Sequence, residues 1–237
     1  MTEPGLLHDR VALITGASRG IGAAVAKRFA AEGAHVVLVA RTVGGLEEVD
    51  DEIKALGGSA TLVPCDITES VRIDNLGPPL LERFGRLDIF VGNAAILGTM
   101  TPLVQYDAKA WQEVFDVNVH ANWRLMRVVD PLLRLSDAGR AILVTSAAAR
   151  NPKAYWGAYA VTKAALETMT QVWAAELANT SVRVNLLNPG ATRTQMRATA
   201  FPGEDPLTLK TPDALTDTFL ELASADCQRH GELVDAA

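Results

Sequence analysis

The chain has 237 residues, of which 49% are hydrophobic and 21% are charged, and its formal net charge is −6. This composition fits a globular protein with a substantial core, and the acidic balance disfavours nonspecific binding to nucleic acid or to an anionic membrane. We find neither an apolar run of about 20 residues nor a signal-peptide h-region near the N-terminus, so we expect a cytoplasmic protein.

Short apolar runs of strand length alternate with amphipathic stretches along the chain. The apolar runs lie at residues 11–15, 36–40, 60–64, 87–91, 141–145 and 182–187, and a seventh short run lies at 232–234. The first six are apolar on both faces, which predicts strands buried within a parallel sheet. Helical patterns fall between them, at residues 21–32, 45–56, 70–84, 108–115, 119–133, 158–178 and 212–223.

This alternation predicts an α/β fold, in which a doubly wound parallel seven-stranded sheet carries helices on both faces, as in the Rossmann fold. No linker divides the chain, so we expect a single domain over residues 1–237. Gly77, Pro78 and Pro79 predict a break or kink in the third helix. Residues 193–210 have weak periodicity, and a loop of that length is usually functional or disordered, so we expect a substrate loop near 194–210.

Small, polar or charged residues follow the predicted strands, at the edge where ligands of open α/β sheets bind. After the first strand come Gly16, Gly20 and Gly22, in the spacing GxxxGxG. Glycines let the backbone approach a pyrophosphate, and the following helix offers free N–H groups and a positive dipole end. Because this motif joins a strand to a helix, it predicts dinucleotide binding rather than a plain glycine turn.

The end of the second strand bears on which dinucleotide binds. An acidic residue there would accept a hydrogen bond from the adenine ribose and select NAD, but this sequence has Arg41. Together with Arg19 of the glycine loop, Arg41 offers a second guanidinium group to a 2′-phosphate. We therefore expect NADP (NADPH) to be preferred and NAD to be possible, the alternative being two solvated surface arginines.

Tyr159 and Lys163 stand four residues apart in a predicted helix, which places both on one face. A free tyrosine has a pKa of about 10, and two positive neighbours, the ammonium and a nicotinamide ring, would favour its phenolate. Ser146, after the fifth strand, could hydrogen-bond a substrate oxygen and stabilise charge there. Such pairs are common on helices, and only Ser146 and the glycine loop make a catalytic role the better interpretation.

Taken together, these motifs resemble the short-chain dehydrogenase/reductase family in its single-domain form, over residues 10–235. The resemblance implies a catalytic tetrad of Asn118, Ser146, Tyr159 and Lys163. The tyrosine would be the general acid–base, the serine would position the carbonyl, and the lysine would bind the nicotinamide ribose and lower the tyrosine pKa. The neighbourhood of the Asn118 carbonyl would hold a water in a proton relay to solvent.

The same resemblance implies the cofactor contacts. Asp66 and Ile67 would flank the adenine, Asn93 would stabilise the sheet near the cofactor, and Thr194 would meet the nicotinamide carboxamide. The full predicted set is Gly16, Ser18, Arg19, Gly20, Ile21, Gly22, Arg41, Asp66, Ile67, Asn93, Ala94, Tyr159, Lys163, Pro189, Gly190, Thr192 and Thr194. The basic pair resembles the NADP-preferring branch, and the overall pattern is oxoacyl reductase-like. Ala95 departs from the family glycine and adds a methyl group near the cofactor.

We therefore expect an NADPH-dependent oxidoreductase that reduces a carbonyl (a ketone, an aldehyde or a 3-oxoacyl group) to an alcohol. The alternatives are an NAD-linked alcohol dehydrogenase and a catalytically idle dinucleotide-binding regulator. We expect the substrate to contact residues 147–149, Tyr155, Trp156 and the loop at 194–210. No metal site is predicted, because Cys65, Cys227 and the histidines lack ligand spacing.

The helical stretches 119–133 and 158–178 carry apolar residues on more than one face. A helix of this kind is buried in a core or at an interface. Since members of the family commonly pair these helices between subunits, we expect a homodimer or homotetramer.

Overall fold

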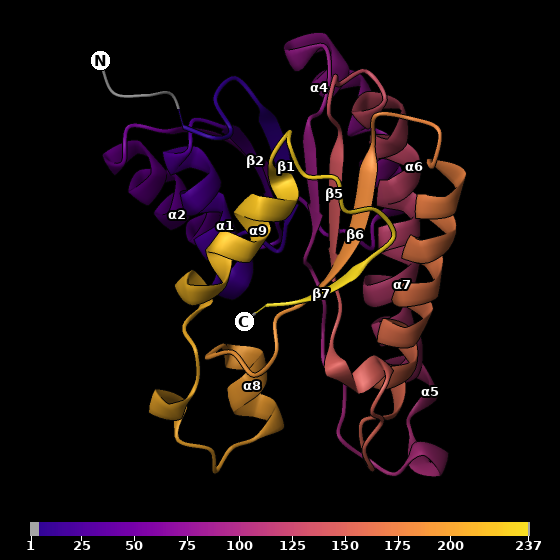
Figure 1. The fold of residues 1–237 in the computed structure, drawn as a ribbon. Helices are drawn as coiled ribbons and strands as arrows, with labels where there is room; N and C mark the ends of the chain where they lie inside the picture. The colour runs from indigo at the N-terminus through magenta and orange to yellow at the C-terminus, as the bar shows by residue number, and fades with distance from the viewer. Residues whose placement is uncertain (1–4, 237) are drawn as a thin grey trace.

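A computed structural model describes residues 5–236, which form one sheet covered by helices on both faces (Figure 1). All seven strands are parallel and lie in the order β3-β2-β1-β4-β5-β6-β7. The predicted doubly wound sheet is therefore confirmed, and the strand order reverses between β1 and β4. The strands are β1 (Val11–Thr15), β2 (His35–Ala40), β3 (Ser59–Pro64), β4 (Ile89–Gly92), β5 (Arg140–Val144), β6 (Arg183–Asn188) and β7 (Leu233–Asp235). Residues 1–4 and 237 of the predicted domain lie outside the described residues.

The helices form two layers, each with its own buried core against the sheet (Figure 1). One face is covered by α1 (Gly20–Ala31), α2 (Val43–Ala55) and α9 (Thr216–Ala223), and its core includes Phe29 and Phe219. The other is covered by α3 (Ser70–Asp74), α4 (Gly77–Phe84), α6 (Ala121–Leu133) and α7 (Gly157–Glu176), and its core includes Phe90 and Trp173. No helix in residues 5–236 has both the length and the apolar character needed to cross a membrane.

Two segments differ from the simplest sequence interpretation. The third helix breaks as predicted, into α3 and α4, and Pro78 falls in the first turn of α4, where a missing N–H costs no helical hydrogen bond. The run at 60–64 was predicted to be a strand buried within the sheet. This prediction is wrong, because β3 is an edge strand and is partly exposed.

The segment predicted as a loop at 193–210 contains regular structure. It holds helix α8 (Gln195–Ala200) and a 3₁₀ turn, η4 (Pro206–Thr208). The hydroxyl of Thr194 caps α8 by accepting from the Arg197 N–H, and the Arg197 guanidinium binds the Glu204 carboxylate through two hydrogen bonds. These local bonds order a segment whose sequence lacks helical periodicity.

The predicted helices 108–115 and 119–133 form one continuous rod. Helix α5 (Ala108–Phe115) leads into a π-helical turn, η2 (Asp116–His120), and then into α6. A π turn widens the backbone hydrogen-bond ladder and is often found at functional sites. The remaining short turns are η1 (Leu103–Gln105), η3 (Ala147–Ala149) and η5 (Pro212–Leu215).

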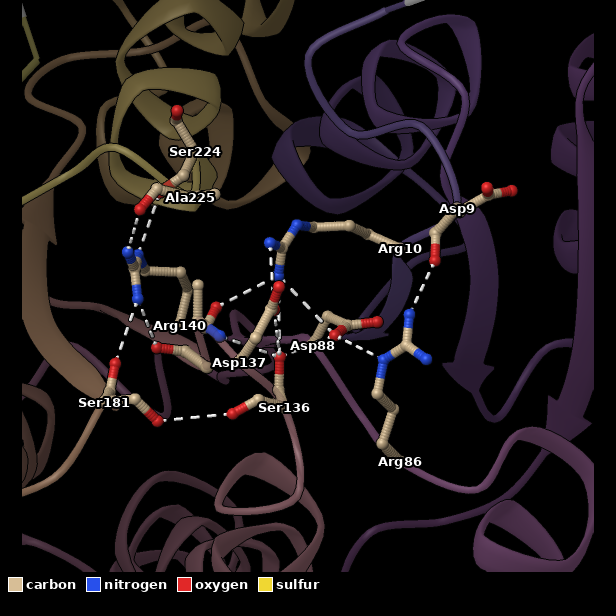
Figure 2. Close-up of polar contacts among 12 residues, drawn as sticks. Asp9, Arg10, Arg86, Asp88, Ser136, Asp137, Arg140, Ser181, Ser224 and Ala225 are labelled. Carbon is tan, nitrogen blue, oxygen red and sulfur yellow. Dashed lines mark hydrogen bonds and ion pairs between the residues drawn. The ribbon is translucent and has the colours of Figure 1, made fainter.

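A buried carboxylate joins segments that precede β1, β4 and β5, at the amino end of the sheet (Figure 2). Asp88 is 0% exposed and accepts hydrogen bonds from the Val11 N–H at 2.9 Å, the Ser136 hydroxyl at 2.6 Å and Arg86 Nε at 2.8 Å. Arg10 adds a second guanidinium 3.5 Å away. The negative charge is thus neutralised and fully hydrogen-bonded, as a buried carboxylate requires.

Beside this carboxylate, Arg140 is 3% exposed and donates to main-chain carbonyls (Figure 2). Its acceptors belong to Gly139, Ser181, Ser224 and Ala225. The two clusters hold the amino ends of the strands together. The polar residues that are predicted to bind a ligand lie at the opposite edge of the sheet, at the carboxyl ends of the strands.

Candidate active site

A cleft of about 720 Å³ lies along the carboxyl ends of the strands. It runs from the glycine loop and Arg41 to Tyr159 and helix α8. Among the predicted site residues, those that line it are Gly16, Ser18, Arg19, Gly20, Ile21, Arg41, Asp66, Ile67, Asn93, Ala94, Ser146, Tyr159, Lys163, Pro189, Gly190, Thr192 and Thr194. Gly22 and Asn118 were also predicted, but they lie behind the wall of the cleft.

The glycine loop owes its shape to residues without a side chain. Gly16 and Gly20 adopt left-handed backbone conformations, with φ of +65° and +57°, which other residues rarely take. A Cβ atom on Gly22 would lie 2.3 Å from the Gly16 carbonyl oxygen, so only glycine lets α1 start this close to the loop. Asn93 fastens the loop by donating from Nδ2 to the Thr15 carbonyl at 2.9 Å.

The start of α1 offers hydrogen-bond donors to the cleft. Arg19 is the N-cap residue, and no side chain within residues 5–236 caps the helix there. The first N–H groups of a helix and its positive dipole end favour an anion. The left-handed glycines and the uncapped helix end thus fit the pyrophosphate of a dinucleotide.

Arg41 and Asp66 lie together at the adenine end predicted for the cleft, with Arg41 Nη1 3.7 Å from Asp66 Oδ2. Burial by itself raises the pKa of Asp66, but hydrogen bonds from the Thr68 N–H and hydroxyl, together with the Arg41 charge, hold it below its usual value. Arg19 and Arg41 are both exposed. Both arginines line the cleft, and the Asp66 carboxylate lies near the guanidinium group of Arg41.

Tyr159, Lys163 and Ser146 meet at the other end of the cleft. Tyr159 and Lys163 are one turn apart on α7 and are 7% and 3% exposed. Lys163 Nζ donates to the Val144 carbonyl at 2.7 Å and lies 5.8 Å from the centre of the Tyr159 ring. Ser146 Oγ accepts from the Ala148 N–H at 3.2 Å, so its own hydrogen is available to another acceptor.

Burial controls the protonation of this pair. It raises the pKa of Tyr159, and the hydrogen bond with Ser146 only partly opposes it. The sequence predicts that Lys163 lowers the tyrosine pKa, but in the protein alone the ammonium points to the Val144 carbonyl and desolvation dominates. Burial also lowers the pKa of Lys163 to about 8, and the Glu167 charge opposes it. At neutral pH, Tyr159 therefore holds its proton and can donate it.

Asn118 sits in the π turn η2 and is 0% exposed. Its side-chain oxygen accepts from the Ile96 N–H at 2.9 Å, and its amide nitrogen donates to the Ile96 carbonyl at 2.9 Å and to Thr162 Oγ1 at 3.0 Å. The Asn118 carbonyl accepts from the Asn122 amide at 3.0 Å. Asn118 thus pins the segment after β4, and its part in a proton relay stays a prediction.

Aromatic and apolar side chains form the substrate end of the cleft. Trp156 packs against Tyr159, with ring centres 5.8 Å apart, and against Phe201, at 5.7 Å. Leu97 and Met196 line the same region. Only part of the predicted substrate wall is present, because Tyr155 and residues 147–149 do not line the cleft, and Tyr155 is 57% exposed.

Some residues that shape the site were not predicted. Thr15 Oγ1 accepts from the N–H groups of Asn93 and Ala94, both at 3.0 Å, and so orders the turn after β4. Glu167 accepts from the Thr145 hydroxyl beside Ser146. The sequence could have indicated Glu167, because a residue four positions after Lys163 lies on the same face of the helix.

Comparison with known proteins identifies the class. The family model described as short chain dehydrogenase matches residues 10–205, and the chain belongs to this family of oxidoreductase enzymes. The chain is 40% identical over 230 residues to the uncharacterized oxidoreductase YciK of Escherichia coli (strain K12), which covers 94% of this chain and 90% of that protein.

Solved structures give the same result. A short chain dehydrogenase from Pseudomonas syringae superposes with a TM-score of 0.96 at 40% identity, covering 100% of this chain and 98% of that one. A short chain dehydrogenase from Escherichia coli CFT073, solved in complex with NADPH, superposes with a TM-score of 0.93 at 39% identity, covering 99% of each chain.

Proposed function

We propose that this enzyme uses NADPH to reduce a carbonyl group, in a ketone, an aldehyde or a 3-oxoacyl compound, to an alcohol. The observation that carries the proposal is the buried group of Tyr159, Lys163 and Ser146, at the opposite end of one cleft from Arg19 and Arg41. The NADPH complex of a relative at 39% identity supports the choice of cofactor.

The two arginines account for a preference for NADPH. A 2′-phosphate carries negative charge and acceptor oxygens that suit a guanidinium group. Arg41 follows β2 directly, where a residue that selects NAD would be acidic. Because Arg41 already faces Asp66, we expect the phosphate to compete with this carboxylate for the guanidinium group.

The side chains of the site supply the proton chemistry. When bound, NADPH supplies the hydride for the carbonyl carbon. Tyr159, whose phenol is protonated at neutral pH, donates its proton to the carbonyl oxygen. The Ser146 hydroxyl, whose oxygen accepts from the Ala148 N–H, donates its hydrogen to that oxygen, orients it and stabilises the charge that develops on it. The Lys163 ammonium then stabilises the phenolate until a new proton arrives.

The lining of the cleft favours an uncharged substrate. Trp156, Leu97 and Met196 surround the end next to Tyr159, while the carboxylate that lines the cleft, Asp66, lies at the far end. Arg197 also lines the substrate end, but Glu204 neutralises its charge, and Arg193, which lines the cleft as well, is exposed to solvent. An apolar ketone, aldehyde or acyl chain would bury its surface there without leaving a charge unpaired.

The test begins with a screen of ketones, aldehydes, quinones and oxoacyl thioesters, followed by NADPH absorbance. We expect Tyr159→Phe to abolish reduction of a substrate found in this way while NADPH still binds. Unchanged turnover in Tyr159→Phe would refute the role of the phenol. NADPH binding without reduction of any compound would favour an idle dinucleotide-binding regulator.

Cofactor preference is measured separately, by fluorescence titration with NADPH and NADH. We expect Arg41→Gln to weaken NADPH binding by about tenfold or more, the cost of one charge-assisted contact, and to leave NADH binding unchanged. Arg193→Gln is a control, because Arg193 also lines the cleft but follows β6, away from the predicted adenine end. Tighter binding of NADH than NADPH by the unaltered protein would overturn the preference and favour an NAD-linked alcohol dehydrogenase.

We also propose that two or four copies assemble through α6 and α7, which lie side by side (Figure 1). Trp123 on α6 is 45% exposed, and Val161 and Val172 on α7 are 44% and 53% exposed. Exposed apolar side chains on neighbouring helices suit a contact with a second copy. Light scattering that finds only a 25.3 kDa species at micromolar concentration would contradict this.

A further inference from the structure

Helix α7 carries a third polar side chain in line with Tyr159 and Lys163. Glu167 follows Lys163 by four residues, as Lys163 follows Tyr159, so the three lie on one face of the helix. The Glu167 carboxylate accepts a hydrogen bond from Thr145 Oγ1, with an oxygen–oxygen distance of 2.7 Å. Its side chain is 13% exposed, so the charge is largely removed from water.

Thr145 stands at the centre of the contact between α7 and the end of β5. Immediately before it, the Val144 carbonyl accepts from Lys163 Nζ at 2.7 Å. Immediately after it, Ser146 lies beside Tyr159 in the cleft and opposes the rise of the Tyr159 pKa. Thr145 itself is 1% exposed. The last residue of β5 and the two residues that follow it thus lie against three successive turns of α7. Glu167, on the last of these turns, binds the middle residue, Thr145.

The charges around Glu167 come from several elements. Arg150, just after η3, places Nε 3.6 Å from Glu167 Oε1 and Nη2 3.7 Å from Asp235 Oδ1 on β7. On α7 itself, Lys163 is the cation one turn away. Within the part of the chain that the structure describes, Glu167 is the carboxylate whose charge acts on Lys163, and it opposes the lowering of the Lys163 pKa by burial.

We propose that Glu167 is a positioning residue of the active site, which fixes the end of β5 through Thr145 and places a negative charge one helical turn from Lys163. A buried ammonium without a counter-charge gives up its proton more readily. A strand end without the Thr145 contact holds Ser146 less firmly. This inference rests on the proposed function, in which Ser146 and Lys163 act together with Tyr159.

The first test measures the protonation of Lys163 directly, without nucleotide or substrate. The protein is labelled with ¹³C at lysine Cε, and the Lys163 resonance is identified by its loss in Lys163→Met. We expect it to titrate near pH 8 in the unaltered protein and at lower pH in Glu167→Gln. Glutamine keeps the shape and an acceptor oxygen for Thr145, so this variant removes only the charge.

A matched control separates this effect from a general change in charge. Glu176→Gln makes the same substitution on the same helix, at an exposed position at its end, and should leave the Lys163 titration unchanged. Arg150→Gln removes the cation that faces Glu167 and should move the titration in the opposite direction, to higher pH. If Glu167→Gln moves the midpoint no more than Glu176→Gln does, the electrostatic part of the inference is wrong.

The second test concerns the tie to β5. Thr145→Val removes the hydroxyl but keeps the Glu167 charge, so we expect kcat to fall by about tenfold with KM unchanged, while the Lys163 midpoint stays near its original value. The alkaline limb of kcat against pH should move to lower pH only in Glu167→Gln. Unchanged kcat in Thr145→Val would overturn the positioning role, whatever its thermal midpoint.

These results are distinguishable from a failure of the proposed function. Turnover that persists in Tyr159→Phe refutes the proposed chemistry, whereas the Lys163 titration is measured without any reaction and still reports the coupling to Glu167. Conversely, a collapse of turnover in Tyr159→Phe together with an unmoved titration in Glu167→Gln keeps the function and removes Glu167 from its machinery.

Discussion

The buried ammonium of Lys163 makes the free energy of unfolding of this protein change with pH in the alkaline range. The substitution Lys163→Met removes that change. Burial lowers the Lys163 pKa from 10.5 to about 8. A difference of about 2.5 pH units, at about 1.4 kcal/mol per unit, corresponds to a cost of about 3.5 kcal/mol for keeping the ammonium charged in the folded protein. The side chain is 3% exposed, so solvent screens little of this cost.

The sign follows from which state releases its proton first. Below pH 8 the lysine is charged in both states, and the folded protein bears the full cost. As the pH rises from about 8 to 10.5, the folded protein releases its proton before the unfolded chain does, and the cost disappears. The contribution of Lys163 to the free energy of unfolding therefore rises over this window.

The measurement compares the unaltered protein with Lys163→Met by urea unfolding at pH 7.5 and at pH 10.5. Other groups that titrate in this range are common to both proteins and cancel in the difference. We subtract the free energy of unfolding of Lys163→Met from that of the unaltered protein at each pH. We expect this difference to increase by about 3 kcal/mol from pH 7.5 to pH 10.5. A difference that changes by less than about 1 kcal/mol would refute the picture of a desolvated ammonium.

Two further predictions concern the ends of the sheet. Asp88→Asn leaves Arg10 and Arg86 without a buried counter-charge, so it should lower the free energy of unfolding by about 3–5 kcal/mol and the melting temperature by about 6–20 °C. Asp137→Asn is the control, because that carboxylate also binds Arg10 but is 83% exposed, and equal losses in the two variants would contradict the reasoning. Gly22→Ala places a Cβ atom 2.3 Å from the Gly16 carbonyl oxygen and should weaken nucleotide binding by about tenfold or more, because α1 must move. Gly44→Ala meets no atom within 4 Å and should preserve affinity, and a nucleotide titration in which both variants bind equally well would argue against the close approach.

The strands and most of the cleft were predictable because they depend on local pattern. Apolar runs of strand length mark the sheet, and parallel strands bring their carboxyl ends to one edge, so Gly16, Asn93 and Ser146 could be placed together from the sequence. The break at Gly77 was also visible, because proline is best tolerated in the first turn of a helix.

Other features depend on contacts between distant residues and were not predictable in the same way. The edge position of β3 follows from strand order, which apolar character alone does not reveal. Tyr155 has a left-handed backbone, with φ of +73°, so it does not share the wall that Trp156 forms. The high pKa of Tyr159 reflects how deeply the folded chain buries it, and no spacing in the sequence reports that depth.

The guanidinium group of Arg140 has a consequence for how the chain reaches its final state. Its acceptors at Ser181, Ser224 and Ala225 lie 41, 84 and 85 residues further along the chain. Contacts of such separation form late, and a guanidinium group buried before they exist would lack its hydrogen bonds. The last two acceptors lie beyond residue 205, where the match to the family model ends. A growing chain therefore cannot complete the hydrogen bonds of Arg140 until the residues after α9 have been made, and a fragment that ends at residue 205 would leave this buried guanidinium group with only the carbonyls of Gly139 and Ser181.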